Sequence, residues 1–284
     1  MKLYKICIGC FLVVVIFLSD VLLAAEQFRI DNEITAGKLV ARSKTYFLDD
    51  DFLSVIDDNG EITYYNAERD TFTLINPSLR IQTQLSAYET RREIELTLDK
   101  TLKEEKKKEK KEKDGYKGSH HQLPLVLFIA NPVFKIEQDP KSGQIALQSD
   151  WVEYKLTTEI FNDNNIAKRY FDFCNLTCYL NCRINNSYRQ LYRLEVNRIL
   201  RNKNRFPQNI SVTFYPLGKS SSKFVGETLN SSHKLIRRLT EEDKNKINSA
   251  RNSMNTFKAV TFDKYQKTIN EEIVKQKDNE QQKK

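Results

Sequence analysis

Apolar residues recur in short runs between residues 35 and 85, and turn-forming residues separate these runs. The apolar runs occupy residues 39–41, 46–48, 52–56, 62–66, 71–75 and 79–85. The last run alternates strictly between apolar and polar residues, which is typical of a strand with one face in water. Asn59-Gly60 predicts a hairpin turn, because positive φ is tolerated at both central residues of such a turn. The pattern therefore predicts an antiparallel meander.

A second strand-rich region begins near Leu123. Strands are predicted at residues 133–136, 143–147, 151–156 and 210–215, with a turn at 139–143 and a further hairpin from 224 to 239. Residues 125–130 are apolar, but the run is too short to distinguish a helix from a strand by its pattern alone.

Three segments carry helical signals. Ser86 and Glu89 have the spacing of a capping box, and a helix from there would bury a stripe formed by Ile94, Leu98 and Leu102. Residues 163–201 contain no Gly or Pro and show helical spacing over much of their length. Thr240 precedes three acidic residues and predicts a helix to about residue 257. We therefore predict an α+β fold with a predominantly antiparallel, curved or half-barrel-like sheet and three main helices.

The N-terminal 25 residues are typical of a secretory signal. Lys2 and Lys5 precede an apolar run from residue 6 to 18, which is shorter than the roughly 20 residues that a membrane span needs. Cleavage is expected after Ala24 or Ala25, and an uncleaved N-terminal anchor is the competing interpretation. We expect the mature chain to be exported, periplasmic or extracellular, with no transmembrane span after cleavage.

The same patterns predict the domain organisation. Residues 26–265 form one α+β domain with two strand-rich halves, 26–102 and 123–265. A charged linker, 103–122, joins the halves, and residues 266–284 are expected to be a loose polar tail.

Glycine positions and charge bear on which classes of function the chain can have. The eight glycines do not form the glycine-rich loops of dinucleotide-binding or P-loop enzymes. The net charge is +8, and residues 103–113 contain seven Lys and four Glu. Charge alone would let this tract bind nucleic acid, anionic lipid or a polyanionic sugar. We interpret it as a solvated helix end and expect no nucleic-acid partner.

Cys174, Cys178 and Cys182 are spaced by four residues. On a helix they would spread over roughly 12 Å of the axis, too far for all three to bind one tetrahedral ion. We interpret them as small apolar residues that pack on one helix face. A thiol or metal role, or a disulfide to another chain, is the alternative, and the three thiols are the weak candidates for a metal site.

Other polar groups carry no recognisable chemistry. Asp57, Asn59, Glu61 and Glu68 match positions of a calcium loop, but Ile62 stands where that loop needs Gly. Residues 49–51, three aspartates, are interpreted as a turn. The three histidines, His120, His121 and His233, accompany no nucleophile motif. We therefore predict no catalytic residues and no cofactor.

Residues 52–85, FLSVIDDNGEITYYNAERDTFTLINPSLRIQTQL, resemble the meander of outer-membrane lipoprotein carriers and related exported proteins. The resemblance implies a curved antiparallel sheet closed over helices around an apolar cavity. Our leading hypothesis is an exported, non-enzymatic protein that binds an apolar ligand such as a lipid acyl chain. The main alternative is an envelope interaction or scaffold protein with no small-molecule ligand. The third is an enzyme of unknown class, which a polar pocket holding carboxylates or a strongly shifted pKa of His233 would reveal.

Overall fold

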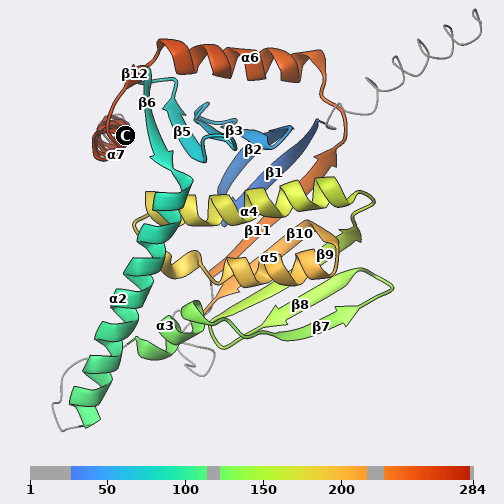
Figure 1. Ribbon diagram of the computed structural model, residues 1–284, viewed down its shortest axis with the longest axis vertical. Helices are drawn as coiled ribbons and strands as arrows, with labels where there is room; N and C mark the ends of the chain where they lie inside the picture. Colours follow the sequence, from blue (N-terminus) through green and yellow to red (C-terminus); the bar gives the residue numbers. More distant parts are fainter. Residues whose placement is uncertain (1–26, 114–121, 216–226, 282–284) are drawn as a thin grey trace, which may run out of the picture.

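The computed structural model describes residues 27–113, 122–215 and 227–281. The predicted signal segment, residues 1–25, lies outside this part of the chain. Within it, all strands belong to one sheet, and helices lie on both faces of that sheet (Figure 1). The α+β prediction is therefore confirmed.

The sheet has 12 strands in the order β12-β6-β5-β4-β3-β2-β1-β11-β10-β9-β8-β7. They are β1 (Phe28–Ala36), β2 (Leu39–Leu48), β3 (Asp51–Ile56), β4 (Ile62–Asn66), β5 (Thr71–Asn76), β6 (Ile81–Ser86), β7 (Lys135–Asp139), β8 (Gln144–Gln148), β9 (Val152–Ile160), β10 (Arg205–Phe214), β11 (Glu227–Ile236) and β12 (Lys258–Ala259). All neighbouring pairs are antiparallel except β12 and β6, which are parallel. The sheet is open, with β12 and β7 at its edges.

Strand β1 joins the two halves of the chain into one sheet. It pairs with β2 on one side and with β11, about 200 residues later, on the other. The predicted meander began only at residue 35 and omitted β1. The strand pattern is nevertheless present in the sequence, because the apolar Phe28 and Ile30 alternate with the charged Arg29 and Asp31.

The helices of the described residues are α2 (Ala87–Lys113), α3 (Leu123–Ala130), α4 (Asn164–Ile184), η1 (Tyr188–Gln190), α5 (Arg193–Asn202), α6 (Glu241–Thr256) and α7 (Phe262–Gln281). The segment predicted as one helix from 163 to 201 is interrupted after Ile184, where Asn186 takes a φ of 46°. Asn tolerates this left-handed conformation, so a helix can end here without glycine.

The structure defines one segment that was left open, changes two further predictions and agrees with a third. Residues 125–130 belong to a helix, α3. Residues 227–236 form a single strand, β11, in place of the expected hairpin, whose residues 224–226 lie outside the described part. Residues 266–281, expected to be a loose tail, belong to α7, which contacts β6. Residues 103–113, interpreted as a solvated helix end, are helical, because α2 continues to Lys113.

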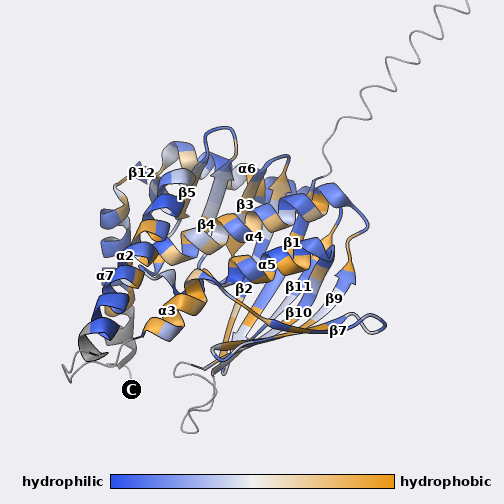
Figure 2. Cartoon of the chain, turned by 60° about the horizontal axis from the view of Figure 1, so that its bottom comes forward, coloured by the Kyte–Doolittle hydropathy of each residue, from blue (hydrophilic) through white to orange (hydrophobic). Residues whose placement is uncertain are grey.

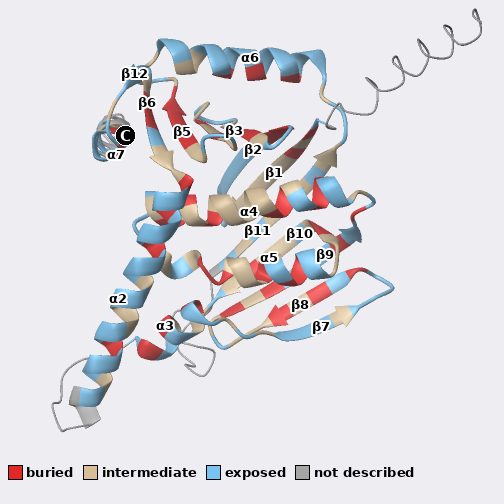
Figure 3. Ribbon diagram, in the orientation of Figure 1, coloured by how far each residue is buried: buried red, intermediate tan, exposed pale blue. Residues whose placement is uncertain are grey.

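Alternation along the strands builds two apolar cores, one on each face of the sheet. Phe28, Phe47 and Phe52 pack against helix α4 in the larger core. Their sequence neighbours Tyr46 and Leu53 face the opposite side, where α6 covers strands β2–β5. Figure 3 shows the buried residues concentrated along α4, α5 and the strands beneath them. In the half of the sheet formed by β1 and β11–β7, the helices of the described residues lie on one face only, and none of them covers the other face (Figure 1).

Candidate functional site

A hollow of about 470 Å³ lies between the N-terminal strands and helices α2 and α4. It lies on the face of the sheet that α4 covers, opposite to α6. Its lining residues come from β2–β5 with their turns, from the start of α2 and from the middle of α4: Phe47, Asp50, Phe52, Tyr65, Ala67, Asp70, Phe72, Ala87, Arg91, Lys168, Arg169, Asp172, Phe173, Asn175, Leu176 and Tyr179. We call this hollow the aromatic pocket.

Stacked rings form the floor of the aromatic pocket. Phe52 and Tyr65, on neighbouring strands, stack with ring centroids 5.2 Å apart, and Phe72 lies 5.2 Å from Tyr65. The ring of Phe173, on α4, forms T-shaped contacts with Phe47 and Phe52, with ring centroids 5.4 and 4.8 Å apart. The rings on the strands are buried, whereas Phe173 is only partly buried. Phe173 therefore stands between the aromatic floor and solvent.

Charged side chains surround the opening. Three cations and three carboxylates line it, so their formal charges cancel: Arg91, Lys168, Arg169, Asp50, Asp70 and Asp172. Asp172 already forms ion pairs with Lys168 at 3.2 Å and with Arg201 at 3.1 Å. The guanidinium of Arg169 lies 4.9 Å from the ring centroid of Phe28. The rim is polar without selecting one sign of charge.

Two tyrosine hydroxyls at the pocket donate hydrogen bonds to carboxylates. Tyr65 Oη lies 2.9 Å from Asp70 Oδ1, and Tyr179 Oη lies 2.9 Å from Glu95 Oε1. Burial, followed by these hydrogen bonds, raises the pKa of both phenols above the usual value. Both tyrosines therefore remain neutral donors at physiological pH, and neither is prepared to act as a base.

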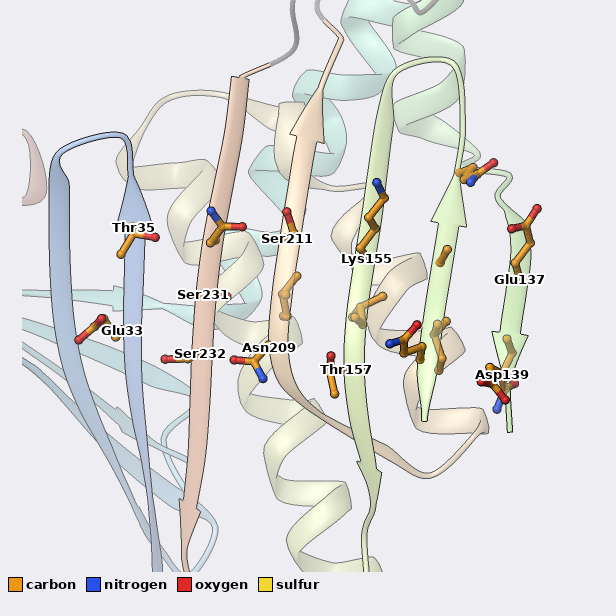
Figure 4. A pocket seen from close by; sticks show the side chains of 18 residues that line it. Glu33, Thr35, Glu137, Asp139, Lys155, Thr157, Asn209, Ser211, Ser231 and Ser232 are labelled. Carbon is orange, nitrogen blue, oxygen red and sulfur yellow. The ribbon is translucent and has the colours of Figure 1, made fainter. Parts of the chain in front are cut away.

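A second hollow, of about 960 Å³, lies on the open face of the sheet. Figure 4 shows side chains of β1, β11, β10, β9, β8 and β7 projecting into it. Short neutral polar side chains line its centre: Thr35, Thr157, Asn209, Ser211, Asn230 and Ser232. They lie in register, since Asn209 is opposite both Ser232 and Thr157. We call this hollow the polar groove.

Charged residues lie at both sides of the polar groove, and Lys155 of β9 lies between them (Figure 4). Glu33 of β1 forms an ion pair with Arg42 at 2.7 Å, and Glu137 of β7 forms one with Lys135 at 2.7 Å. Because both pairs are exposed, each adds little to stability. The groove thus offers hydroxyl and amide groups and the Lys155 ammonium for hydrogen bonding, and none of its lining residues is aromatic.

The three cysteines lie where α4 meets the larger core. All three are free thiols, and Cys178 and Cys182 are buried. Burial raises the pKa of Cys174 to about 11. Cys178 Sγ donates to the carbonyl oxygen of Gln190 at 3.4 Å. Its hydrogen bond with Cys182, followed by burial, raises the pKa of Cys178. The same hydrogen bond lowers the pKa of Cys182, whose side chain is buried in the core. Cys174 and Cys178 are therefore neutral thiols and poor nucleophiles, and burial limits access to Cys182.

His233 lies on β11, under the helices. Burial, with a smaller effect of the Arg193 guanidinium, lowers its pKa to about 4. Its Nε2 lies 3.1 Å from Ser231 Oγ on the same strand. A pKa this far from the ordinary value is the sign we associated with the enzyme alternative. However, the described residues show no carboxylate hydrogen-bonded to this imidazole, and a triad needs such an orienting group. His120 and His121 lie outside the described residues.

The residues that match a calcium loop form ordinary turns. Asn59 Oδ1 accepts from the backbone N–H of Glu61 at 3.0 Å inside the β3–β4 hairpin loop. Gly60 has a φ of 68°, whereas Asn59 does not have positive φ, so the turn is not the two-residue type that we predicted. Asp51 accepts from the backbone N–H of Ala67 at 2.8 Å. Across the described ranges, no group of three or more His, Cys, Asp or Glu is arranged to hold a metal ion.

No family model matches the chain, and no curated protein matches it at a significant level. Helices in the described part of the chain lack the combined length and apolar character that crossing a bilayer demands.

Proposed function

We propose that the mature chain is an exported, non-enzymatic protein that binds an apolar ligand, such as a lipid acyl chain, in the aromatic pocket. The observation that carries the proposal is the floor of stacked rings beneath Phe173. Small-molecule sites typically combine such an apolar lining with a few polar groups at the opening. The predicted signal supports export. The intact mass of the exported protein tests it, and we expect a chain that begins at Ala25 or Glu26.

The shape and charge of the pocket define the ligand class. Its volume lies within the roughly 300–1,000 Å³ range of ligand sites. Because the rim charges cancel, the apolar part of the ligand provides most of the binding free energy, at about 25 cal/mol per Å² buried. We therefore expect neutral and anionic acyl compounds to bind with similar affinity.

A fluorescent fatty acid and a fluorescent monoacylglycerol test this proposal directly. Leu176 lines the pocket from α4, and Leu176→Trp would fill the space that the acyl chain occupies. We expect the wild-type protein to bind both probes and Leu176→Trp to bind them at least tenfold more weakly. Leu39→Trp is the matched control, because Leu39 is 76% exposed in the β1–β2 hairpin.

Two results would contradict the proposal. One is no saturable binding of either probe by a correctly folded wild-type protein. The other is equal loss of binding in Leu176→Trp and Leu39→Trp, which would point to a site elsewhere. Circular dichroism of each variant separates a blocked pocket from an unfolded chain.

The polar groove supports the second candidate, an envelope interaction protein. Its hydroxyl and amide lining, uncovered by any helix of the described residues, suits a polar polymer such as a neutral polysaccharide. Sedimentation with insoluble cell-wall glycan distinguishes the candidates. Binding that is lost in Ser211→Arg while acyl-probe binding persists would assign this role to the groove.

A further inference from the structure

Helix α3 exposes an apolar face. All eight of its residues, LPLVLFIA, are apolar. Leu123, Val126 and Ile129 are buried, whereas Leu127 is 44% exposed and Val133, just beyond the helix, is 71% exposed. A helix at a protein surface normally carries polar residues on its outer face. The outer face of α3 therefore points to an apolar partner.

A lysine-rich stretch of α2 lies against α3. The Glu105 carboxylate accepts from the backbone N–H of Gln122 at 2.8 Å and forms an ion pair with Lys108. The basic stretch thus begins beside the first turn of α3. Figure 2 shows the apolar α3 next to the hydrophilic turns of α2, and α2 projects beyond the sheet in Figure 1.

The exposed charge of this stretch is positive. Residues 103–110 contain five lysines and three glutamates, and Glu105 is buried with its ion pair to Lys108. The remaining lysines are all exposed: Lys103, Lys106, Lys107 and Lys110. On a helix, Lys106 lies about 100° from Glu105, on the flank of the surface that Glu105 presents to α3. The exposed lysines of α2 therefore place positive charge beside the apolar face of α3.

We propose that this surface docks on an anionic lipid bilayer. We call it the α2–α3 tip, and it comprises residues 103–110, α3 and Val133. The exposed apolar side chains enter the interface between headgroups and acyl chains, while the lysines lie against the anionic headgroups. A bilayer is favoured because it offers both partners in one continuous surface. The tip shares no residue with the aromatic pocket, so docking and acyl binding are tested separately.

Sedimentation with lipid vesicles tests the docking surface. We expect the wild-type chain without residues 1–25 to bind vesicles of phosphatidylcholine with 30% phosphatidylglycerol, and to bind pure phosphatidylcholine at least tenfold more weakly. Reversing Lys103, Lys106, Lys107 and Lys110 to Glu should weaken binding at least tenfold. Leu127→Glu should do the same, and its fold should survive because Leu127 is exposed. Raising the salt concentration should weaken wild-type binding.

A matched control reverses four exposed lysines elsewhere: Lys141, Lys155, Lys234 and Lys246. This control changes the net charge equally and should bind anionic vesicles like wild type. Equal loss in both quadruple variants, or no binding by wild type, would overturn the proposal. So would a change of oligomeric state in Leu127→Glu, measured by analytical ultracentrifugation, because the face would then join two copies of the chain. Acyl-probe uptake in each variant reports on the pocket independently.

Discussion

Asp243 shows how one buried carboxylate holds α6 on the sheet. The residue is 2% exposed, and its carboxylate lies 2.6 Å from the Arg29 guanidinium on β1. It also forms a reciprocal capping box with Thr240 at the start of α6. The backbone hydrogen bond of Thr240 and the Arg29 guanidinium outweigh burial and lower the pKa of Asp243. Sequence predicted the cap from Thr240, but the ion pair joins residues 214 positions apart and has no local signal.

His233 allows a prediction at the same scale. Its pKa is about 4 in the folded protein, below the ordinary 6.5, so between these pH values only the unfolded chain is protonated. Stability contributed by this residue is therefore present above pH 6.5 and is lost as the pH falls toward 4. His233→Gln should remove about 1–2 kcal/mol of the decrease in unfolding free energy between pH 7 and pH 4.5.

Urea unfolding of wild type and His233→Gln at both pH values measures this difference. Carboxylates such as Asp243 titrate in both proteins, so their contribution cancels in the comparison. Identical pH dependence in the two proteins, or an NMR titration of His233 with a pKa near 6.5, would contradict the burial that we describe.

Among the elements, the positions of the turns were predicted well, whereas the type of the β3–β4 turn and the helix ends were predicted less well. Gly60 and Gly143 both lie at hairpin turns and both have positive φ, as the turn residues indicated. The break between α4 and α5 at Asn186 lacks the usual glycine. Helix α7 was missed because its polar composition resembles a tail, although Phe262 and Tyr265 are buried. A polar composition shows that most of a segment is exposed to solvent, but it does not show whether the segment is helical and packs on the rest of the protein.

The β7–β8 hairpin depends on Gly143, and this gives a prediction for the element. Gly143 has a φ of 70°, and a Cβ there would lie 2.4 Å from the Thr158 carbonyl oxygen on β9. Gly37 in the β1–β2 hairpin has a φ of 59° but nothing within 4 Å. Gly37→Ala should cost about 1 kcal/mol of stability from the backbone alone, and Gly143→Ala about 2–4 kcal/mol, because β9 must also shift.

Denaturant unfolding of the two alanine variants checks this difference. Equal destabilisation would mean that the close approach of β8 to β9 does not constrain residue 143.

For the whole molecule, pairing between distant segments decides both the fold and the site. Alternation identifies a strand and its two faces, but it does not identify the neighbouring strand. The β1–β11 pairing that joins the halves was therefore outside the reach of the sequence patterns. The same holds for the aromatic pocket, whose rings come from β2, β3, β4, β5 and α4 with no common motif. Local patterns predicted the sheet and its apolar face, and assembly created the hollow.

The location of the bound ligand tests the central claim most directly. Photo-crosslinking of wild-type protein with a diazirine-bearing fatty acid, followed by peptide mass spectrometry, identifies the residues that touch the acyl chain. We predict that labelled sites fall on α4 around Phe173 and Leu176 and on the strands that carry Phe52 and Tyr65, and that unlabelled fatty acid competes. Labelling confined to the open face of the sheet, or none above the level without light, would contradict the account.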